Sequence, residues 1–167
     1  LSTGSKAMKN IAVALSLTCS LAWASGYMWW VTARIEPRGA HYDGIPVENL
    51  ALPLTTLTLL NCEGSAATFT PEQCADVRAN TARFEAAGDF NNDTIADIAR
   101  VGVAELKGGG LVRVLLIGPK DKPKQHQIFK LRENGFSALF GDDPLMWYQC
   151  MQCDHGAHIR WDVARKA

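Results

Sequence analysis

The chain has 167 residues, its 17 Lys and Arg are balanced by 17 Asp and Glu, and 47% of it is hydrophobic. This length fits one domain, or one domain with an appendage. The balanced charge argues against a nucleic-acid-binding protein, because a phosphate-binding surface shows as an excess of Lys and Arg. The hydrophobic content argues against a chain that is disordered throughout.

The first feature along the chain is an uncharged, apolar segment from Ile11 to Thr32. One interpretation is a signal peptide over residues 1–24, with cleavage after Ala24. The alternative is a retained membrane anchor over residues 11–32, with Trp29 and Trp30 at the membrane interface. A buried core helix is disfavoured by its position and length. The first two interpretations place the remaining chain outside the cytoplasm, either periplasmic or secreted, and only the anchor predicts contact with a membrane.

The cysteines support the same compartment. Four of them follow the apolar segment: Cys62, Cys74, Cys150 and Cys153. An even number of cysteines in an oxidising compartment predicts disulfides. The sequence leaves three pairings open, and we favour the most local one, Cys62 with Cys74 and Cys150 with Cys153.

The predicted elements begin with an extended, Pro- and Gly-rich lead-in over residues 25–53, followed by a single β-rich domain over residues 54–167. A strand is expected over residues 54–60. A helix is then expected from Thr70, whose side chain forms a capping box with Gln73.

The rest of the chain predicts strands joined by short turns. They cover residues 82–87, 97–106, 111–117 and 125–131, with a last pair at 147–151 and 158–162. Gly108–Gly110 and Asn134–Gly135 are expected to be hairpin turns. The predicted fold class is therefore mainly β, an antiparallel sheet or meander with one short helix.

The segment after residue 88 is the most informative for function. Oxygen-bearing side chains stand at Asp89, Asn91, Asp93 and Asp97, which are positions 1, 3, 5 and 9 of a calcium loop. A hard cation takes six to eight oxygens, and alternate residues of a curled loop aim theirs inward. Ile95, at position 7, is expected to give its carbonyl while its side chain anchors the loop in the core.

Residues 87–101, AGDFNNDTIADIARV, resemble the loop-and-strand signature of the FG-GAP/VCBS-type repeats. The resemblance implies a four-stranded antiparallel unit with calcium bound between two strands by the four side chains named above. Asn92 and Thr94 stand where the family has glycines, which disfavours the sharp turn because a β-branched residue resists a left-handed conformation. The alternative is a turn held by its own side-chain hydrogen bonds. A single copy does not build a propeller, so other blades would come from partner chains, or the fold is a different one.

A second cluster lies near the C-terminus. Cys150, Cys153, His155 and His158 are the residue types that hold zinc, and the two cysteines form a C-x-x-C pair of the kind found in redox centres. The cramped spacing favours a structural disulfide instead.

Together these patterns predict an exported, non-enzymatic β domain with a calcium-type loop that binds a protein or cell-envelope partner. The alternative is a thiol-redox or zinc protein that uses the Cys150–His158 cluster.

Overall fold

The computed structural model describes residues 28–142, 144–152 and 157–158. It confirms the expected class, because strands dominate, every pairing between named strands is antiparallel, and the helices are short. The expected leader over residues 1–24 lies outside the described residues. In the part of the chain that is described, no helix has the length and apolarity to cross a membrane.

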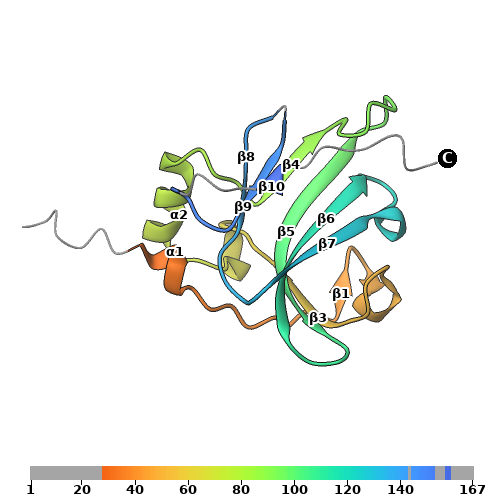
Figure 1. Cartoon of the computed structure of the whole chain (residues 1–167), viewed down its shortest axis with the longest axis horizontal. Coiled ribbons are helices and arrows are strands. Elements are labelled where there is room, and N and C mark those ends of the chain that lie inside the picture. Colours follow the sequence, from red (N-terminus) through yellow and green to blue (C-terminus); the bar gives the residue numbers. More distant parts are fainter. Residues whose placement is uncertain (1–27, 143, 153–156, 159–167) are drawn as a thin grey trace, which may run out of the picture.

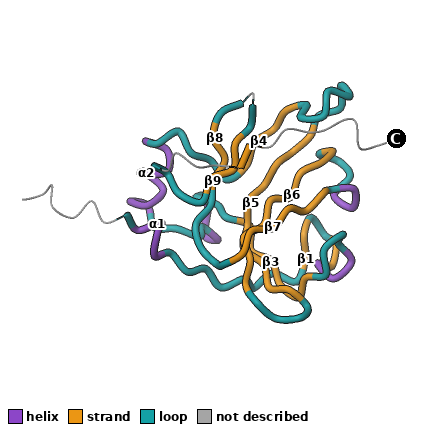
Figure 2. The backbone as a smooth tube through the Cα atoms, viewed as in Figure 1, coloured by secondary structure: helices purple, strands orange, loops and turns teal. Residues whose placement is uncertain are grey.

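A five-stranded sheet forms the centre of the molecule (Figures 1 and 2). Its strands are β3 (Leu54–Leu59), β4 (Glu85–Gly88), β5 (Asp97–Leu106), β6 (Leu111–Pro119) and β7 (Gln127–Arg132). The order is β3-β5-β6-β7, and β4 also pairs with β5. The Gly108–Gly110 turn joins β5 to β6 as the sequence predicts.

Strands β3 and β4 share one edge of β5. β4 pairs with residues 97–100 and β3 with residues 102–106. Val101 lies between the two ladders: its N–H donates to the Phe84 carbonyl at 3.0 Å, and its carbonyl accepts from the Leu60 N–H at 2.9 Å. The sheet edge therefore forks at Val101.

Both faces of the central sheet are covered, which explains the nearly continuous apolar runs in β5 and β6. Val101 and Val103 belong to the larger core, whereas Ala104 and Val114 belong to a second core on the opposite face.

The larger core lies beneath helices α1 (Trp29–Thr32) and α2 (Pro71–Ala79) and a second sheet of order β10-β9-β8. That sheet consists of β8 (Ala138–Phe140), β9 (Met146–Tyr148) and β10 (Ala157–His158). The last two pair as the sequence predicts, but β9 ends at Tyr148 rather than at residue 151, and residues 159–162 of the expected last strand lie outside the described residues. The hairpin of β1 (His41–Tyr42) and β2 (Ile45–Pro46) and the 3-10 turn η1 (Val47–Asn49) cover the smaller core. Two further 3-10 turns are η2 (Gly64–Ala66) and η3 (Pro123–Gln125).

Helix α2 begins as its sequence predicts. The Thr70 side chain accepts from the Gln73 N–H at 3.3 Å, and the Gln73 side chain accepts from the Thr70 N–H at 3.0 Å. The favoured disulfide between Cys62 and Cys74 is present and ties this helix to the segment that follows β3.

The predicted hairpin at Asn134–Gly135 is wrong, because β7 and β8 belong to different sheets. The Asn134 side chain instead clasps the backbone of Ile35, accepting from its N–H at 3.2 Å and donating to its carbonyl at 2.8 Å. Gly135 has a φ of 149°. A Cβ there would lie 2.6 Å from Nη2 of the buried Arg113, so the glycine permits this close approach.

The N-terminal part of the described chain belongs to the fold. Trp30 is buried in the larger core, and the Trp29 ring lies 5.2 Å from that of Phe69 and 5.3 Å from that of Phe136. These contacts place both tryptophans against the larger core. Within the expected lead-in, Tyr42 and Val47 are also buried core residues.

Candidate functional site

The candidate site is the loop that joins β4 to β5. Gly88 and Asp97 pair at the base of this loop, so residues 89–96 form the loop at the end of the β4–β5 hairpin (Figure 1). This is a loop between two antiparallel strands, the setting that the family resemblance implies.

Backbone N–H groups reach the first carboxylate of the loop. The Asp89 Oδ1 atom accepts from the Asp93 N–H at 3.0 Å, and Oδ2 accepts from the Thr94 N–H at 2.8 Å. Asp89 therefore draws the far side of the loop back onto its start.

Asn91 and Asp93 continue the same turn. Asn91 Oδ1 accepts from the Asp93 N–H at 2.9 Å, and its Nδ2 donates to Asp93 Oδ2 at 2.9 Å. Asp93 Oδ1 accepts from the Ile95 N–H at 2.8 Å. Such side-chain-to-backbone bonds are typical of Asx turns.

Asp97 is the fourth predicted ligand and is completely buried. Its Oδ2 accepts from the Phe90 N–H at 3.1 Å, whereas its Oδ1 is buried and has no hydrogen-bond partner among the described residues. Burial raises the pKa of this carboxyl; the Phe90 hydrogen bond opposes the rise, and the charges of Asp93 and Asp89 add to it. A buried carboxylate oxygen beside two further carboxylates is costly unless a cation or a proton compensates it.

The two residues that replace the family glycines take the conformation that glycine favours. Asn92 has a φ of 56° and Thr94 a φ of 68°. Asparagine tolerates this left-handed region, but a β-branched threonine is strained there. The loop therefore keeps its turn despite the substitutions, held by the Asp89 and Asp93 hydrogen bonds.

The structure thus brings Asp89, Asn91 and Asp93 into one turn and places Asp97 at its base, with most of their oxygens bound to N–H groups. No group of three His, Cys, Asp or Glu side chains within the described ranges is arranged to hold a metal. The orphaned Asp97 Oδ1 is the observation that fits a cation.

The expected role of the Ile95 side chain is wrong. It is 48% exposed instead of anchoring the loop in the core. The hydrogen bond from its N–H to Asp93 fixes it at the outer side of the turn. Phe90 instead packs against the larger core, and Ile98, the second residue of β5, is buried.

The second predicted cluster is only partly visible. Cys150 is buried and disulfide-bonded. Cys153, His155 and the side chain of His158 lie outside the described residues, so the predicted second bridge and the zinc or redox alternative stay predictions. The Cys62–Cys74 disulfide is consistent with an extracytoplasmic location.

The sequence does not predict a buried polar chain beside the loop. The Tyr42 hydroxyl lies 2.8 Å from His126 Nδ1, and His126 Nε2 lies 2.9 Å from the carbonyl oxygen of Pro119, the residue opposite Asp97 in the β5–β6 ladder. Tyr42 and His126 are 84 positions apart, and no local pattern joins them.

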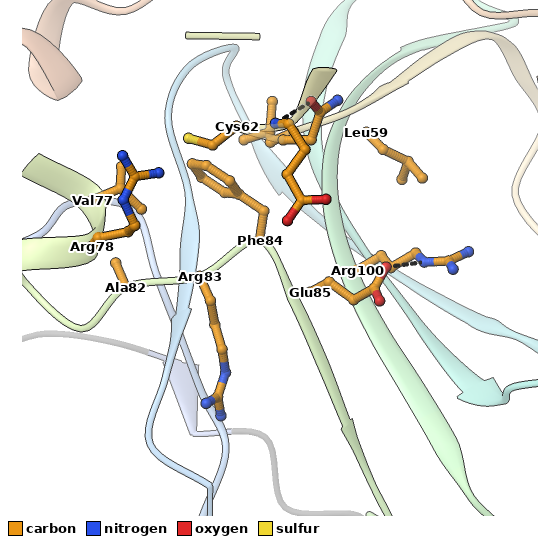
Figure 3. A pocket seen from close by; sticks show the side chains of 12 residues that line it. Leu59, Cys62, Val77, Arg78, Ala82, Arg83, Phe84, Glu85 and Arg100 are labelled. Atoms are coloured by element: carbon orange, nitrogen blue, oxygen red, sulfur yellow. Dashed lines mark hydrogen bonds and ion pairs between the residues drawn. The ribbon is translucent and has the colours of Figure 1, made fainter. Parts of the chain in front are cut away.

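A cavity of about 400 Å³ opens at the fork between β3 and β4. Residues from the end of β3, from α2 and from the segment leading into β4 line it (Figure 3). The sequence does not predict this cavity either, because its walls come from segments that only the shared edge of β5 brings together.

Comparison with known proteins finds no family model, no curated protein and no solved structure that matches this chain.

Proposed function

We propose that the chain is an exported, periplasmic or secreted, non-enzymatic β domain, similar to a single FG-GAP/VCBS-type unit, whose β4–β5 loop takes one calcium ion. The orphaned Oδ1 of buried Asp97 carries the proposal. Asp89, Asn91 and Asp93 lie in the same turn and offer the oxygen ligands that calcium prefers.

The position of Asp97 explains what the ion would do for the domain. Asp97 is the first residue of β5, the strand that pairs with β3, β4 and β6. Calcium bound there compensates a buried negative charge and fixes the start of the central strand. Binding of the native state then stabilises the fold by mass action.

His126 has a structural role in the core. Both of its ring nitrogens are engaged there, by Tyr42 and by the Pro119 carbonyl, so the ring holds the fold together. The role that we propose for the domain is binding a protein or cell-envelope partner.

Calorimetric titration with calcium chloride tests the ion. The wild-type chain is expected to bind one calcium and to melt at a higher temperature when loaded. Asp93→Asn removes one ligand charge and is expected to bind at least tenfold more weakly. Asp121→Asn, in the exposed turn after β6, is the matched control and retains wild-type affinity. No heat at millimolar calcium, or equal binding by Asp93→Asn, would overturn the proposal.

Capture from a cell-envelope extract tests the partner. The immobilised domain is expected to retain a partner in calcium and to release it in chelator. Asp93→Asn is expected to capture less in calcium, whereas Asp121→Asn captures as the wild type does. Identical capture by the wild type under both conditions would separate partner binding from the calcium loop.

A further inference from the structure

The cavity at the β3–β4 fork, here called the fork pocket, follows from the topology of the sheet. Only one strand can pair with a given edge of β5 at a given residue. β3 and β4 share that edge end to end, and both leave it next to Val101. The chain segments on either side of Val101 diverge, and a cavity of about 400 Å³ remains between them.

The fork pocket is mainly apolar inside. Its apolar lining consists of Leu59, Leu60, Cys62, Val77, Ala82 and Phe84. A concave, mainly apolar surface with a few polar groups at its margin is typical of small-molecule sites, and the volume falls within their usual range of roughly 300–1,000 Å³.

Charged residues surround this lining, and most of them are already paired. Arg100 donates from Nε to Glu85 at 2.8 Å and from Nη1 to Asp43 at 2.6 Å. Arg83 donates to Asp142 at 2.6 Å and to the Gly141 carbonyl. In Figure 3, Arg78 and Arg100 lie on opposite sides of the cavity with the Phe84 ring between them.

Two charged lining residues are outside these ion pairs. In the described part of the chain, neither the Arg78 guanidinium nor the Glu63 carboxylate has a side-chain hydrogen bond or an ion pair. Within the described residues, the fork pocket therefore offers the exposed Arg78 cation and the exposed Glu63 anion at its margin, without recorded partners, and an apolar interior.

We infer that the fork pocket binds a small zwitterion with an apolar body, which is the chemistry of an apolar amino acid or a short apolar peptide. Arg78 takes the carboxylate, because a guanidinium binds a carboxylate in a two-pronged manner. Glu63 takes the ammonium group. The apolar side chain packs against Phe84, Val77 and Ala82.

The charge account selects this class over simpler ligands. Arg78 and Glu63 are both exposed, so the ligand is selected by which of the two it pairs with. A purely anionic ligand would pair with Arg78 alone, a purely cationic ligand with Glu63 alone, and an uncharged apolar ligand with neither. A zwitterion satisfies both.

The fork pocket is separate from the calcium loop, although both use the β4–β5 ladder. Glu85 pairs with Arg100 at the pocket, and Gly88 pairs with Asp97 at the loop. The pocket proposal does not require calcium, so its test is run in chelator and repeated in calcium.

The test is calorimetric titration of the purified full chain. The probes are L-phenylalanine, L-leucine and L-leucyl-L-leucine. Two analogues of phenylalanine each lack one charge: 3-phenylpropanoate lacks the ammonium and phenethylamine lacks the carboxylate. At least one zwitterion is expected to bind, with each analogue at least tenfold weaker. Tighter binding of the dipeptide assigns short peptides as the ligand, and tighter binding of a single amino acid assigns free amino acids.

Two variants separate the charges. Arg78→Gln is expected to lower the affinity for the zwitterion at least tenfold and to leave the affinity for phenethylamine unchanged. Glu63→Gln is expected to lower the affinity for the zwitterion by the same factor and to leave the affinity for 3-phenylpropanoate unchanged. Arg38→Gln is the matched control and is expected to bind as the wild type does, because Arg38 forms an exposed ion pair with Glu36 and does not line the cavity. No heat from any zwitterion at millimolar concentration, analogues that bind equally well, or wild-type affinity in both charge variants would overturn the inference.

Discussion

Tyr42 and His126 form a hydrogen bond of 2.8 Å in the core, between the tyrosine Oη and the imidazole Nδ1. The other ring nitrogen, Nε2, faces the Pro119 carbonyl at 2.9 Å. A carbonyl only accepts, so Nε2 carries the proton and Nδ1 accepts from the tyrosine. Burial raises the pKa of Tyr42 to about 12, although Arg100 acts to lower it. The hydroxyl therefore stays protonated and remains a donor. These hydrogen bonds join the β1–β2 hairpin to the end of β6.

Replacing Tyr42 by phenylalanine tests that connection. Tyr42→Phe leaves His126 Nδ1 buried without a donor, and we expect it to lower the free energy of unfolding by about 1–3 kcal/mol. Urea titration followed by circular dichroism measures the change. Tyr148→Phe is the control, because within the described ranges the Tyr148 hydroxyl donates only to the Met146 sulfur, at 3.5 Å, and we expect a change below about 0.5 kcal/mol. Equal effects of the two substitutions would contradict the role of the buried chain.

Asp97 is expected to give the domain a pH dependence, which bound calcium would reverse under the proposed function. Its pKa is raised in the folded state, so without calcium its contribution is present below about pH 4 and is lost as the pH rises through the folded pKa. Asp97→Asn keeps an acceptor for the Phe90 N–H but carries no charge. In chelator, the free energy of unfolding of the wild type is expected to fall relative to Asp97→Asn as the pH rises from about 4 to neutral.

Calcium is expected to stabilise the wild type at neutral pH and to lose this effect as the carboxylates protonate near about pH 4. Asp97→Asn is expected to respond little at either pH. A wild-type stability in chelator that rises relative to Asp97→Asn with increasing pH would show that the buried carboxylate is compensated by the protein itself.

Helix and strand bounds were predictable where they depend on residues that are close in sequence. The capping box of α2 uses Thr70 and Gln73, three residues apart, and β5 begins and ends where its apolar pattern predicts, at Asp97 and Leu106. The Asp- and Asn-rich composition of the loop also predicted a turn held by its own side-chain hydrogen bonds, and the Asp89 and Asp93 bonds close over two to five residues.

The features that the sequence did not predict depend on distant segments. Asn134–Gly135 has the composition of a hairpin turn. The Asn134 side chain instead bonds the backbone of Ile35, and Gly135 permits a close approach to Arg113, and both partners belong to other parts of the fold. The fork pocket exists because two strands share one edge of β5, and strand patterns carry no information about that choice. The exposure of Ile95 follows from how the loop leaves the sheet rather than from its apolar character.

The Cys62–Cys74 bridge is expected to carry a substantial part of the stability. It closes a short loop, with a sequence separation of 12, and loops of this size correspond to about 3 kcal/mol of stabilisation. We expect the double variant Cys62→Ala/Cys74→Ala to lose about 2–4 kcal/mol in urea unfolding. Ser65→Ala, exposed inside the same loop, serves as the control and is expected to change stability by less than about 0.5 kcal/mol. A loss below about 1 kcal/mol in the double variant would mean that η2 and α2 hold their positions without the bridge.

Thr94 holds strain that glycine would remove. Its φ of 68° is unfavourable for a β-branched residue, by about 1–2 kcal/mol. Thr94→Gly is therefore expected to raise the free energy of unfolding by about 1 kcal/mol, after the greater entropy of glycine in the unfolded chain is subtracted. Asn92→Gly is the graded comparison and is expected to gain less, because asparagine tolerates the same region. Thermal unfolding of both variants measures the difference, and a larger gain from Asn92→Gly would show that φ does not determine the strain.

Trp30 decides where the folded domain begins. Its side chain is 7% exposed within the larger core, whereas the neighbouring Val31 is 55% exposed. Trp30→Ala is expected to cost about 3–5 kcal/mol in urea unfolding, and Val31→Ala less than about 0.5 kcal/mol. With that result, Trp30 belongs to the core, and cleavage after Ala24 would leave that core intact. If Trp30→Ala costs no more than Val31→Ala, the ring does not stabilise the domain, and the assignment of α1 to the fold fails.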